Sequence, residues 1–336
     1  CNGTETNGAN VFSIDSLSIA PSYTSASLSV NTVARGGVEI ESIDSIKFNA
    51  PRNYKIQNRA VVAKDFERII LNENTNIAST VAFGGEDASP PTHGKVFIAI
   101  KPQGELIATE TVKQQIKNSI QDRTMLGIDP VIIDPVYLFV IPTINTFYDT
   151  LKTATTSSSI QTLIRSAISD FSTTSLEQFG KKLRYSRFVR TLDNVNDAVL
   201  NNEATFKMQK RFVPSTVSKQ LIKLEYHNAI VPSSLLSTSF TFNNFTAFLD
   251  DDGLGNVRIF RFNSDKQKVS INSTAGTINY TTGEVNINDF LVSAFDGIEI
   301  KVDADPVNKD IVPVREQIII ISSADATINT TSEVGD

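Results

Sequence analysis

The stretch APRNYKIQNRAVVAKDFERIILNENTNIASTVAFGGEDASPPTHGKVFIAIKP, residues 50–102, decides the fold of the first half of this chain. Its apolar residues recur first with helical spacing and then with the spacing of strands. Residues 77–83 form an extended apolar run, and residues 95–101 alternate apolar and polar side chains, as a half-buried strand does. The apolar stripe that predicts the short helix before them consists of Val62, Phe66, Ile69 and Ile70.

The segments before and after this stretch are predicted to complete a compact unit with it. Apolar residues alternate with polar ones over residues 11–48, which predicts strands, for example around Ile43 and Ile46. A second helix is predicted where Val112, Ile116 and Ile120 share one face. Residues 137–141 then close the unit as a strand. The order of elements predicts helices packed on one side of a small mixed sheet.

A helical segment follows a Ser/Thr-rich joint at residues 153–159. Ser158 and Gln161 have the spacing of a capping box at the start of a helix. The next apolar stripe keeps helical spacing over three turns, so one face of this helix must be buried. It consists of Ile160, Leu163, Ile164, Ala167, Ile168 and Phe171. Residues 176–183 are predicted to form a further short helix.

From residue 205 onward the pattern is that of strands about ten residues apart, which favours a sandwich or a barrel-like domain. Gly253, Gly283 and Gly297 each lie between extended segments, as turn residues do. Residues 276–287 are predicted to form a hairpin around the second of these glycines.

The sequence therefore predicts an α+β chain in four parts. These are an N-terminal β-rich segment (1–48), a small αββαβ unit (49–155), a helical connector (156–204) and a C-terminal β-sandwich or barrel-like domain (205–336).

Composition excludes several classes of function. The chain has 336 residues, 40% of them hydrophobic, which is enough for two or three domain cores. The net charge of -6 argues against broad binding to nucleic acid, which needs a strongly basic face. No apolar run approaches the roughly 20 residues of a membrane-spanning helix. We therefore expect neither nucleic acid nor a membrane as a partner.

The chain starts at Cys1, followed by a polar stretch, and this start has two interpretations. One is a processed bacterial lipoprotein or adhesin anchored through Cys1. The other is a fragment of a longer polypeptide, which we favour because the lipoprotein hypothesis explains none of the internal motifs.

Candidate catalytic and metal sites are weak. The GGED sequence at residues 84–87 resembles a nucleotide-cyclase signature, but a Pro-containing loop follows it, so we favour a surface turn whose glycines allow positive φ. Asp250, Asp251 and Asp252 lack the spacing of a calcium loop, which favours a solvated acidic turn. Neither His93 nor His227 lies in a nucleophile motif. No catalytic residue, metal site or cofactor is predicted.

A basic cluster is the most prominent charge feature. Lys181, Lys182, Arg184, Arg187 and Arg190 are interleaved with Tyr185 and Phe188. The cluster can be a solvated helix face or a protein–protein contact, in which Arg and Tyr are favoured.

Several motifs resemble a known family. The proline-led NRAV sequence at residues 58–61, the helix after it and the Pro/Gly-then-strand exit resemble the baseplate J-like family of contractile-tail bacteriophages. FGGED at 83–87, FGKKLRYSRFVRTLDN at 179–194 and KMQKRF at 207–212 resemble the C-terminal part of the gene-six type of wedge subunits in T4-like phages. The resemblance covers residues 43–262.

This resemblance implies a structural, non-enzymatic subunit in the virion's tail baseplate, assembled in the host cytoplasm. It implies a homodimer that also contacts other wedge subunits and neighbouring wedges and forms the inner baseplate ring. Because the helix stripe and the basic cluster are candidate contact surfaces, we expect the interface residues Ile160, Leu163, Ile164, Phe171, Phe179, Lys182, Arg184, Tyr185, Arg187, Phe188 and Arg190.

Overall fold

The computed structural model describes residues 59–88, 90–152 and 156–333, together with residues 9, 42–44, 46–47 and 50. Contacts divide the chain into two compact units, Cys1–Asp134 and Pro135–Asp336, called here the first and the second unit. The finer division of the chain into four parts stays a prediction. No helix within the described ranges combines the length and the hydropathy needed to cross a bilayer.

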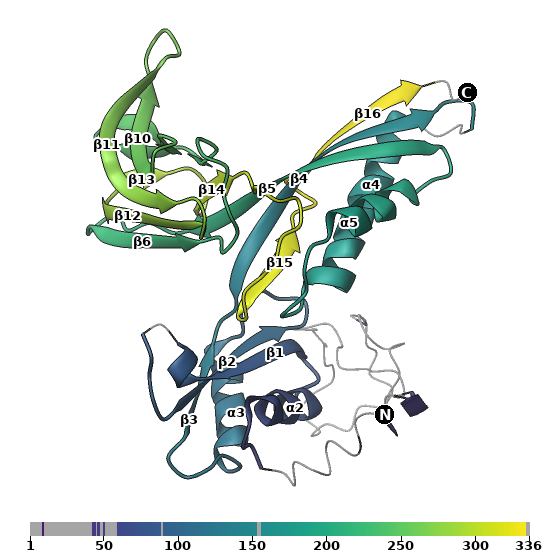
Figure 1. The fold of residues 1–336 in the computed structure, drawn as a ribbon, viewed down its shortest axis with the longest axis vertical. Coiled ribbons are helices and arrows are strands. Elements are labelled where there is room, and N and C mark those ends of the chain that lie inside the picture. Colours follow the sequence, from purple (N-terminus) through teal and green to yellow (C-terminus); the bar gives the residue numbers. More distant parts are fainter. Residues whose placement is uncertain are drawn as a thin grey trace, which may run out of the picture. The chain divides into compact units, whose positions relative to one another are not determined.

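The first unit is a three-stranded sheet with two helices on one face (Figure 1). Strand β2 is central, pairing with β1 in antiparallel and with β3 in parallel orientation. This order of helix, strand, strand, helix and strand is the predicted one and confirms the α+β class, but its last strand is β3 and not residues 137–141. Its elements are α2 (Ala63–Glu73), β1 (Ile77–Gly84), the 3-10 turn η2 (Gly85–Asp87), β2 (Lys95–Pro102), α3 (Glu110–Gln121) and β3 (Asp129–Ile133).

The apolar stripes of both helices form the core of the first unit. Ile116 and Ile120 of α3 are fully buried, and Val112 packs beside them, as predicted. In α2, Phe66 and Ile70 are buried, but Val62 is 57% exposed because it is the N-cap residue and precedes the first helical turn. The predicted stripe of α2 is therefore one residue too long.

The N-terminal strands predicted for residues 11–48 are not found where that segment is described. Residues 43–44 and 46–47 are helical, and the Ile46 N–H donates to the Ser42 carbonyl over 2.9 Å. Ile43 and Ile46 are spaced by three residues, which suits a helix as well as an alternating strand. The other residues of the segment, except residue 9, lie outside the described part.

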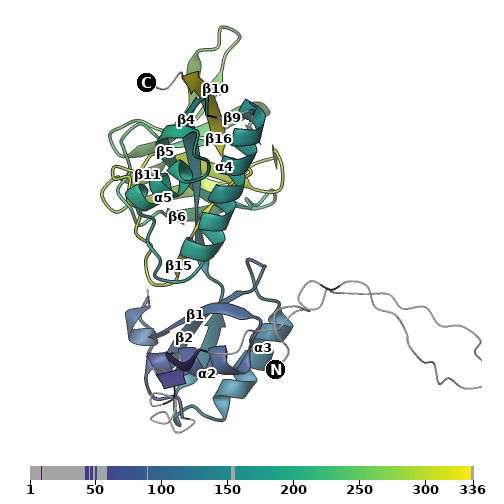
Figure 2. The ribbon, with the colours of Figure 1, turned by 90° about the vertical axis from the view of Figure 1, so that its right-hand side faces the viewer.

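The second unit combines helices with a large mixed sheet of thirteen strands, which is not closed into a barrel (Figures 1 and 2). Its first half comprises β4 (Val136–Asp149), α4 (Ser157–Phe171), the π-turn η3 (Ser172–Leu176), α5 (Tyr185–Asp193) and β5 (Val199–Phe212). The strands that follow are β6 (Gln220–Glu225), β7 (Leu236–Ser237), β8 (Phe240–Phe242), β9 (Phe245–Asp251), β10 (Asn256–Phe262), β11 (Lys268–Asn279), β12 (Glu284–Phe290), β13 (Ala294–Phe295), β14 (Ile300–Ala304), β15 (Gln317–Ile321) and β16 (Thr327–Glu333).

Strand β4 organises the second unit. It pairs along its length with β5 in antiparallel orientation. On its other side, β15 pairs in parallel with residues 136–140 and β16 with residues 143–149. The end of the chain thus returns to its first strand. Residues 137–141 are a strand, as predicted, but they belong to this sheet and do not close the first unit, because their partners are β5 and β15.

Helices α4 and α5 cover one face of this part of the sheet. Thr156 caps α4 by accepting a hydrogen bond from the Ser159 N–H, so the predicted capping box at Ser158 and Gln161 is wrong. The helix predicted at residues 176–183 is also wrong: η3 ends at Leu176, and α5 begins at Tyr185 after a turn in which Gly180 has a positive φ of 75°.

The remaining predicted turns are confirmed. Gly253, Gly283 and Gly297 have φ between 71° and 77°, a conformation in which glycine has no steric penalty. Strands β11 and β12 form the predicted hairpin, with Gly276 opposite Ile287.

Candidate interaction surfaces

The apolar stripe of α4 is satisfied within the chain itself. Ile160, Ile164 and Phe171 are buried in the core that α4 shares with α5 and the sheet. Phe188 of α5 is fully buried and packs edge-to-face on Phe171 and Phe206, with ring centroids 5.5 and 5.2 Å apart. Of the predicted stripe residues, Leu163 is on the outer side and is 40% exposed. The four buried side chains therefore have a structural role within this chain; they are those of Ile160, Ile164, Phe171 and Phe188.

The basic segment, defined here as residues 179–190, lies on the surface at the start of α5. The Arg184 guanidinium contacts the Asp310 carboxylate at 2.6 Å, and the Tyr185 N–H donates to the same carboxylate over 2.8 Å. The Arg184 hydrogen bond, supported by the Tyr185 N–H, lowers the pKa of Asp310. Lys309 lies over the Tyr185 ring at 4.3 Å. These contacts tie the start of α5 to the loop before β15.

The other cations of the basic segment point outward without an acidic partner. Lys181, Lys182, Arg187 and Arg190 are exposed, and none has a carboxylate within ion-pair distance among the residues that the structure describes. Phe179 is half-buried and engaged in a contact of its own. The segment thus presents four unpaired positive charges on the surface of an acidic chain, and whether they contact a partner stays a prediction.

The acidic triplet at the end of β9, Asp250 to Asp252, is not the solvated turn that the sequence suggested. Asp250 and Asp251 are each only 4% exposed. Asp250 is held by a bidentate contact with Arg258, both bonds being 3.0 Å long, and by Lys268 at 3.0 Å. Asp252 caps the turn locally, and its hydrogen bonds, first of all that from the Asn256 side chain, lower its pKa to about 2. The strong partners explain why the acidic groups tolerate burial.

Asp251 fixes a loop that precedes β7. Its carboxylate accepts from the Ser233 and Leu235 N–H groups at 2.6 and 2.9 Å and from the Tyr280 hydroxyl at 2.6 Å. Burial, and then the Asp251 hydrogen bond, raise the pKa of Tyr280. Every bond to Asp251 comes from the chain itself, so this carboxylate is a structural acceptor.

The GGED turn has a different physical cause from the one expected. Gly84 has a φ of -67°, and neither Gly84 nor Gly85 lies in the positive-φ region. A Cβ on Gly85 would instead lie 1.8 Å from the Thr92 carbonyl oxygen. The Thr92 N–H also donates to the Gly85 carbonyl over 2.8 Å. Glycine is required here because two backbone segments approach closely.

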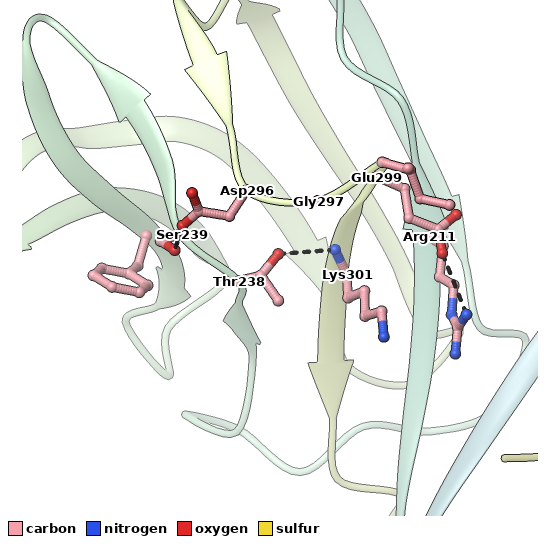
Figure 3. A pocket seen from close by; sticks show the side chains of 9 residues that line it. Arg211, Thr238, Ser239, Asp296, Gly297, Glu299 and Lys301 are labelled. Carbon is pink, nitrogen blue, oxygen red and sulfur yellow. Dashed lines mark hydrogen bonds and ion pairs between the residues drawn. The ribbon is translucent and has the colours of Figure 1, made fainter. Parts of the chain in front are cut away.

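An open hollow of about 660 Å³ lies between β5, β7, β14 and the residues before β14 (Figure 3). Its cations are already paired. Arg211 contacts Glu299 and Asp325, each at 3.2 Å, and lies 3.8 Å from the centre of the Phe139 ring. Lys301 contacts Asp325 at 3.4 Å. A network that joins four segments therefore borders the hollow through Arg211, Glu299 and Lys301, and no sequence motif indicated it because its residues are far apart in the chain.

A second charged cluster surrounds the buried Lys210. Its ammonium group donates to the Tyr137 carbonyl over 2.9 Å, and burial lowers its pKa to about 8 against an opposing influence of Glu225. Glu225 also contacts Lys223 at 2.6 Å and His227 at 3.4 Å. Burial lowers the pKa of His227. The described residues contain no group of three or more His, Cys, Asp or Glu side chains placed to bind a metal.

Comparison with known proteins matches both units. A family model described as baseplate structural protein gp6, C-terminal domain I, matches residues 62–133, and the model of C-terminal domain III of the same protein matches residues 136–211. The gap between the two matches coincides with the boundary between the compact units at residues 134 and 135.

A curated relative extends the match. The baseplate wedge protein gp6 of Enterobacteria phage T4 is 27% identical over 242 residues, which is 70% of this chain and 36% of the relative. The chain thus spans about a third of that relative's length. A cryo-EM structure of the anti-feeding prophage baseplate covers 49% of this chain and 37% of its own, with 12% identity and a TM-score of 0.37, a likeness too distant to bear on function.

Each compact unit thus contains a region similar to a C-terminal domain of a baseplate structural protein. The chain is therefore similar to gp6-like baseplate wedge proteins in both units, as the sequence motifs suggested. No finding favours the alternative of a surface lipoprotein, and Cys1 lies outside the described residues.

Proposed function

We propose that this chain is a structural subunit of a contractile phage tail baseplate wedge and acts by holding neighbouring subunits together. The observation that carries the proposal is the match of gp6 C-terminal domain I to residues 62–133 of the first unit and of C-terminal domain III to residues 136–211 of the second unit. Its role in this proposal requires no chemical transformation and no cofactor. Its place is the tail baseplate of the virion, assembled in the host cytoplasm.

The partners in this proposal are a second copy of the chain, other wedge subunits and neighbouring wedges. The basic segment supports a contact role, because its four unpaired cations lie on the surface of a chain with a net charge of -6. Arg is enriched at protein interfaces, and an unpaired surface charge is free to meet an acidic partner. Leu163, on the outer side of α4, adds an apolar group to the same proposal.

The experiment that tests the proposal is the detection of the chain in purified virions. An affinity label placed after the last residue would be located by electron microscopy of isolated tails and of tail-less heads. We expect the label at the baseplate. A label found in host membranes, or in heads alone, would overturn the proposal.

Homodimer formation needs its own measurement. Light scattering on a size-exclusion column would give the solution mass of this 36.8 kDa chain over a tenfold range of concentration. We expect the mass of a dimer at the upper end of the range. A monomer mass at every concentration would contradict self-association of this chain while leaving the baseplate location to the labelling experiment.

A further inference from the structure

Strand β11 is paired on both sides over only part of its length. Its residues 276–279 pair with β12, whereas residues 268–272 pair with β10 and, among the described strands, with no strand on the other side. In Figure 1 the β10–β11 hairpin extends past β12. Residues 268–275, called here the open edge, therefore leave one row of backbone N–H and C=O groups without a neighbouring strand.

A cavity of about 390 Å³ lies where β11 and β12 separate. Its volume is within the roughly 300–1,000 Å³ of sites that hold ligands. Ile259 and Phe290, both almost fully buried, and the half-buried Phe242 give it an apolar floor. The full lining is Lys219, Phe242, Asn243, Ile259, Asn272, Asn288, Asp289, Phe290 and Leu291. Because Asn272 belongs to the open edge, the cavity and the edge are continuous.

The polar groups of this cavity include amides that nothing in the chain uses. The side chains of Asn243 and Asn288 make no hydrogen bond in the ranges that the structure describes. Asn272 accepts from the Thr274 N–H over 3.0 Å, which leaves its NH₂ group as a donor. Lys219 and Asp289 lie 3.9 Å apart at the rim and balance each other's charge. The cavity thus offers uncharged donors and acceptors above an apolar floor.

Two other edge strands, β1 and β16, have backbone groups bonded by the chain's own side chains. At the edge strand β1, the Ala82 N–H donates to the Glu67 carboxylate over 3.1 Å. At β16, the Gln161 side chain donates to the Ile328 carbonyl over 3.3 Å, and Arg165 donates to the Ala326 carbonyl over 3.3 Å. Such coverage prevents pairing with foreign strands. Along the open edge, the Thr274 N–H donates to the Asn272 side chain, and no other backbone group of residues 268–275 has a side-chain partner among the described residues.

We propose that the gap between β11 and β12 binds an extended segment of a neighbouring protein, which adds as a strand to the open edge. Strand addition satisfies the unpaired backbone groups, and alternate side chains of the added segment enter the cavity. The occupant is a segment of low net charge with an apolar residue for the floor and polar groups for the amides of Asn243 and Asn288. This inference rests on the proposed function, because the neighbour is another protein of the baseplate.

Hydrogen–deuterium exchange tests the proposal on the free chain and on purified tails that contain it. We expect the amides of residues 268–275 to exchange at least about tenfold more slowly in tails, because strand pairing protects them. The turn at residues 263–267 serves as the internal control and is expected to exchange alike in both samples. If the chain is present in the tails and residues 268–275 exchange as in the free chain, strand addition is overturned and the proposed function stands. Absence of the chain from tails would overturn both.

A variant that fills the cavity supplies an independent test. Asn288→Trp is expected to lower incorporation into tails by about tenfold or more, since the indole occupies the space of the incoming side chain. Thr281→Trp, in the exposed β11–β12 turn, is the matched control and is expected to assemble normally. Asn288→Ala, which removes the amide without adding bulk, keeps the test valid if Asn288→Trp fails to fold. Normal incorporation of both Asn288 variants would overturn the proposal.

Discussion

Lys210 shows how a single buried charge sets a pH dependence. Its pKa is 10.5 in the unfolded chain and about 8 in the fold, so the folded protein binds fewer protons than the unfolded chain between these pH values. The free energy of unfolding therefore rises with pH across this window. Below pH 8 the full cost of the buried ammonium is present, which amounts to about 3 kcal/mol.

We predict that Lys210→Met stabilises the protein at pH 7 by about 1–2 kcal/mol, because part of the gain is offset by the loss of the hydrogen bond from Lys210 to the Tyr137 carbonyl. The variant is also expected to lose the rise in stability between pH 8 and 10.5. Denaturant unfolding at a series of pH values measures both effects. Lys207→Met, at an exposed position of the same strand, is the control; a destabilised Lys210→Met would contradict the prediction.

Asp251 is the second residue with a sharp expectation. Its carboxylate holds the Ser233 and Leu235 amides and the Tyr280 hydroxyl, all within 2.9 Å. We predict that Asp251→Ala lowers the free energy of unfolding by roughly 2–4 kcal/mol, because three donors lose their acceptor. Asp252→Ala, which affects a local turn alone, is expected to lower the free energy of unfolding by less. Equal losses in chemical denaturation would show that Asp251 has no special role.

At the scale of elements, α4 illustrates how a cap is selected. Several hydroxyl residues precede this helix, and the sequence pattern favoured Ser158, whereas Thr156 supplies the acceptor. We predict that Thr156→Ala destabilises the protein by about 1 kcal/mol, the usual cost of losing a cap. Ser158→Ala, inside the first turn, is expected to have little effect. Thermal unfolding measures the destabilisation by each variant. A larger loss for Ser158→Ala than for Thr156→Ala would favour the capping box at Ser158.

Helix α5 separates structural from surface residues within nine positions. Phe188 and Leu192 face the core, while Arg187 and Arg190 face outward. The sequence placed Arg187, Phe188 and Arg190 on one candidate contact surface because arginine and aromatic residues both favour interfaces. Periodicity identifies a buried face, but it does not say whether the covering partner is this chain or another.

At the scale of the whole molecule, the division of α5 into a buried and an exposed face predicts one defect in folding and another in assembly. We expect Phe188→Ala to lower the free energy of unfolding by about 3–5 kcal/mol, since it opens a cavity beside Phe171 and Phe206. We expect the double variant Arg187→Glu and Arg190→Glu to fold normally and to reduce incorporation into tails by about tenfold or more.

Circular dichroism of the isolated chain and the yield of assembled tails measure these defects separately. Lys207→Glu with Lys266→Glu, two exposed lysines outside the basic segment and outside the cavity at β11, is the matched charge control. If the arginine pair and this control had the same yield of tails, the basic segment would not be a contact surface.

The sequence by itself determined the α+β class, the helix stripes, the hairpin at residues 276–287 and the similarity to gp6, because periodicity and local motifs depend on neighbouring residues. It could not place β15 and β16 beside β4, since parallel pairing across more than 170 residues leaves no local pattern. The Arg211 network and the open edge of β11 likewise depend on which distant segments meet. Only the tertiary structure decided these features, because burial and free backbone groups are properties of the assembled neighbours of a residue and not of its position in the chain.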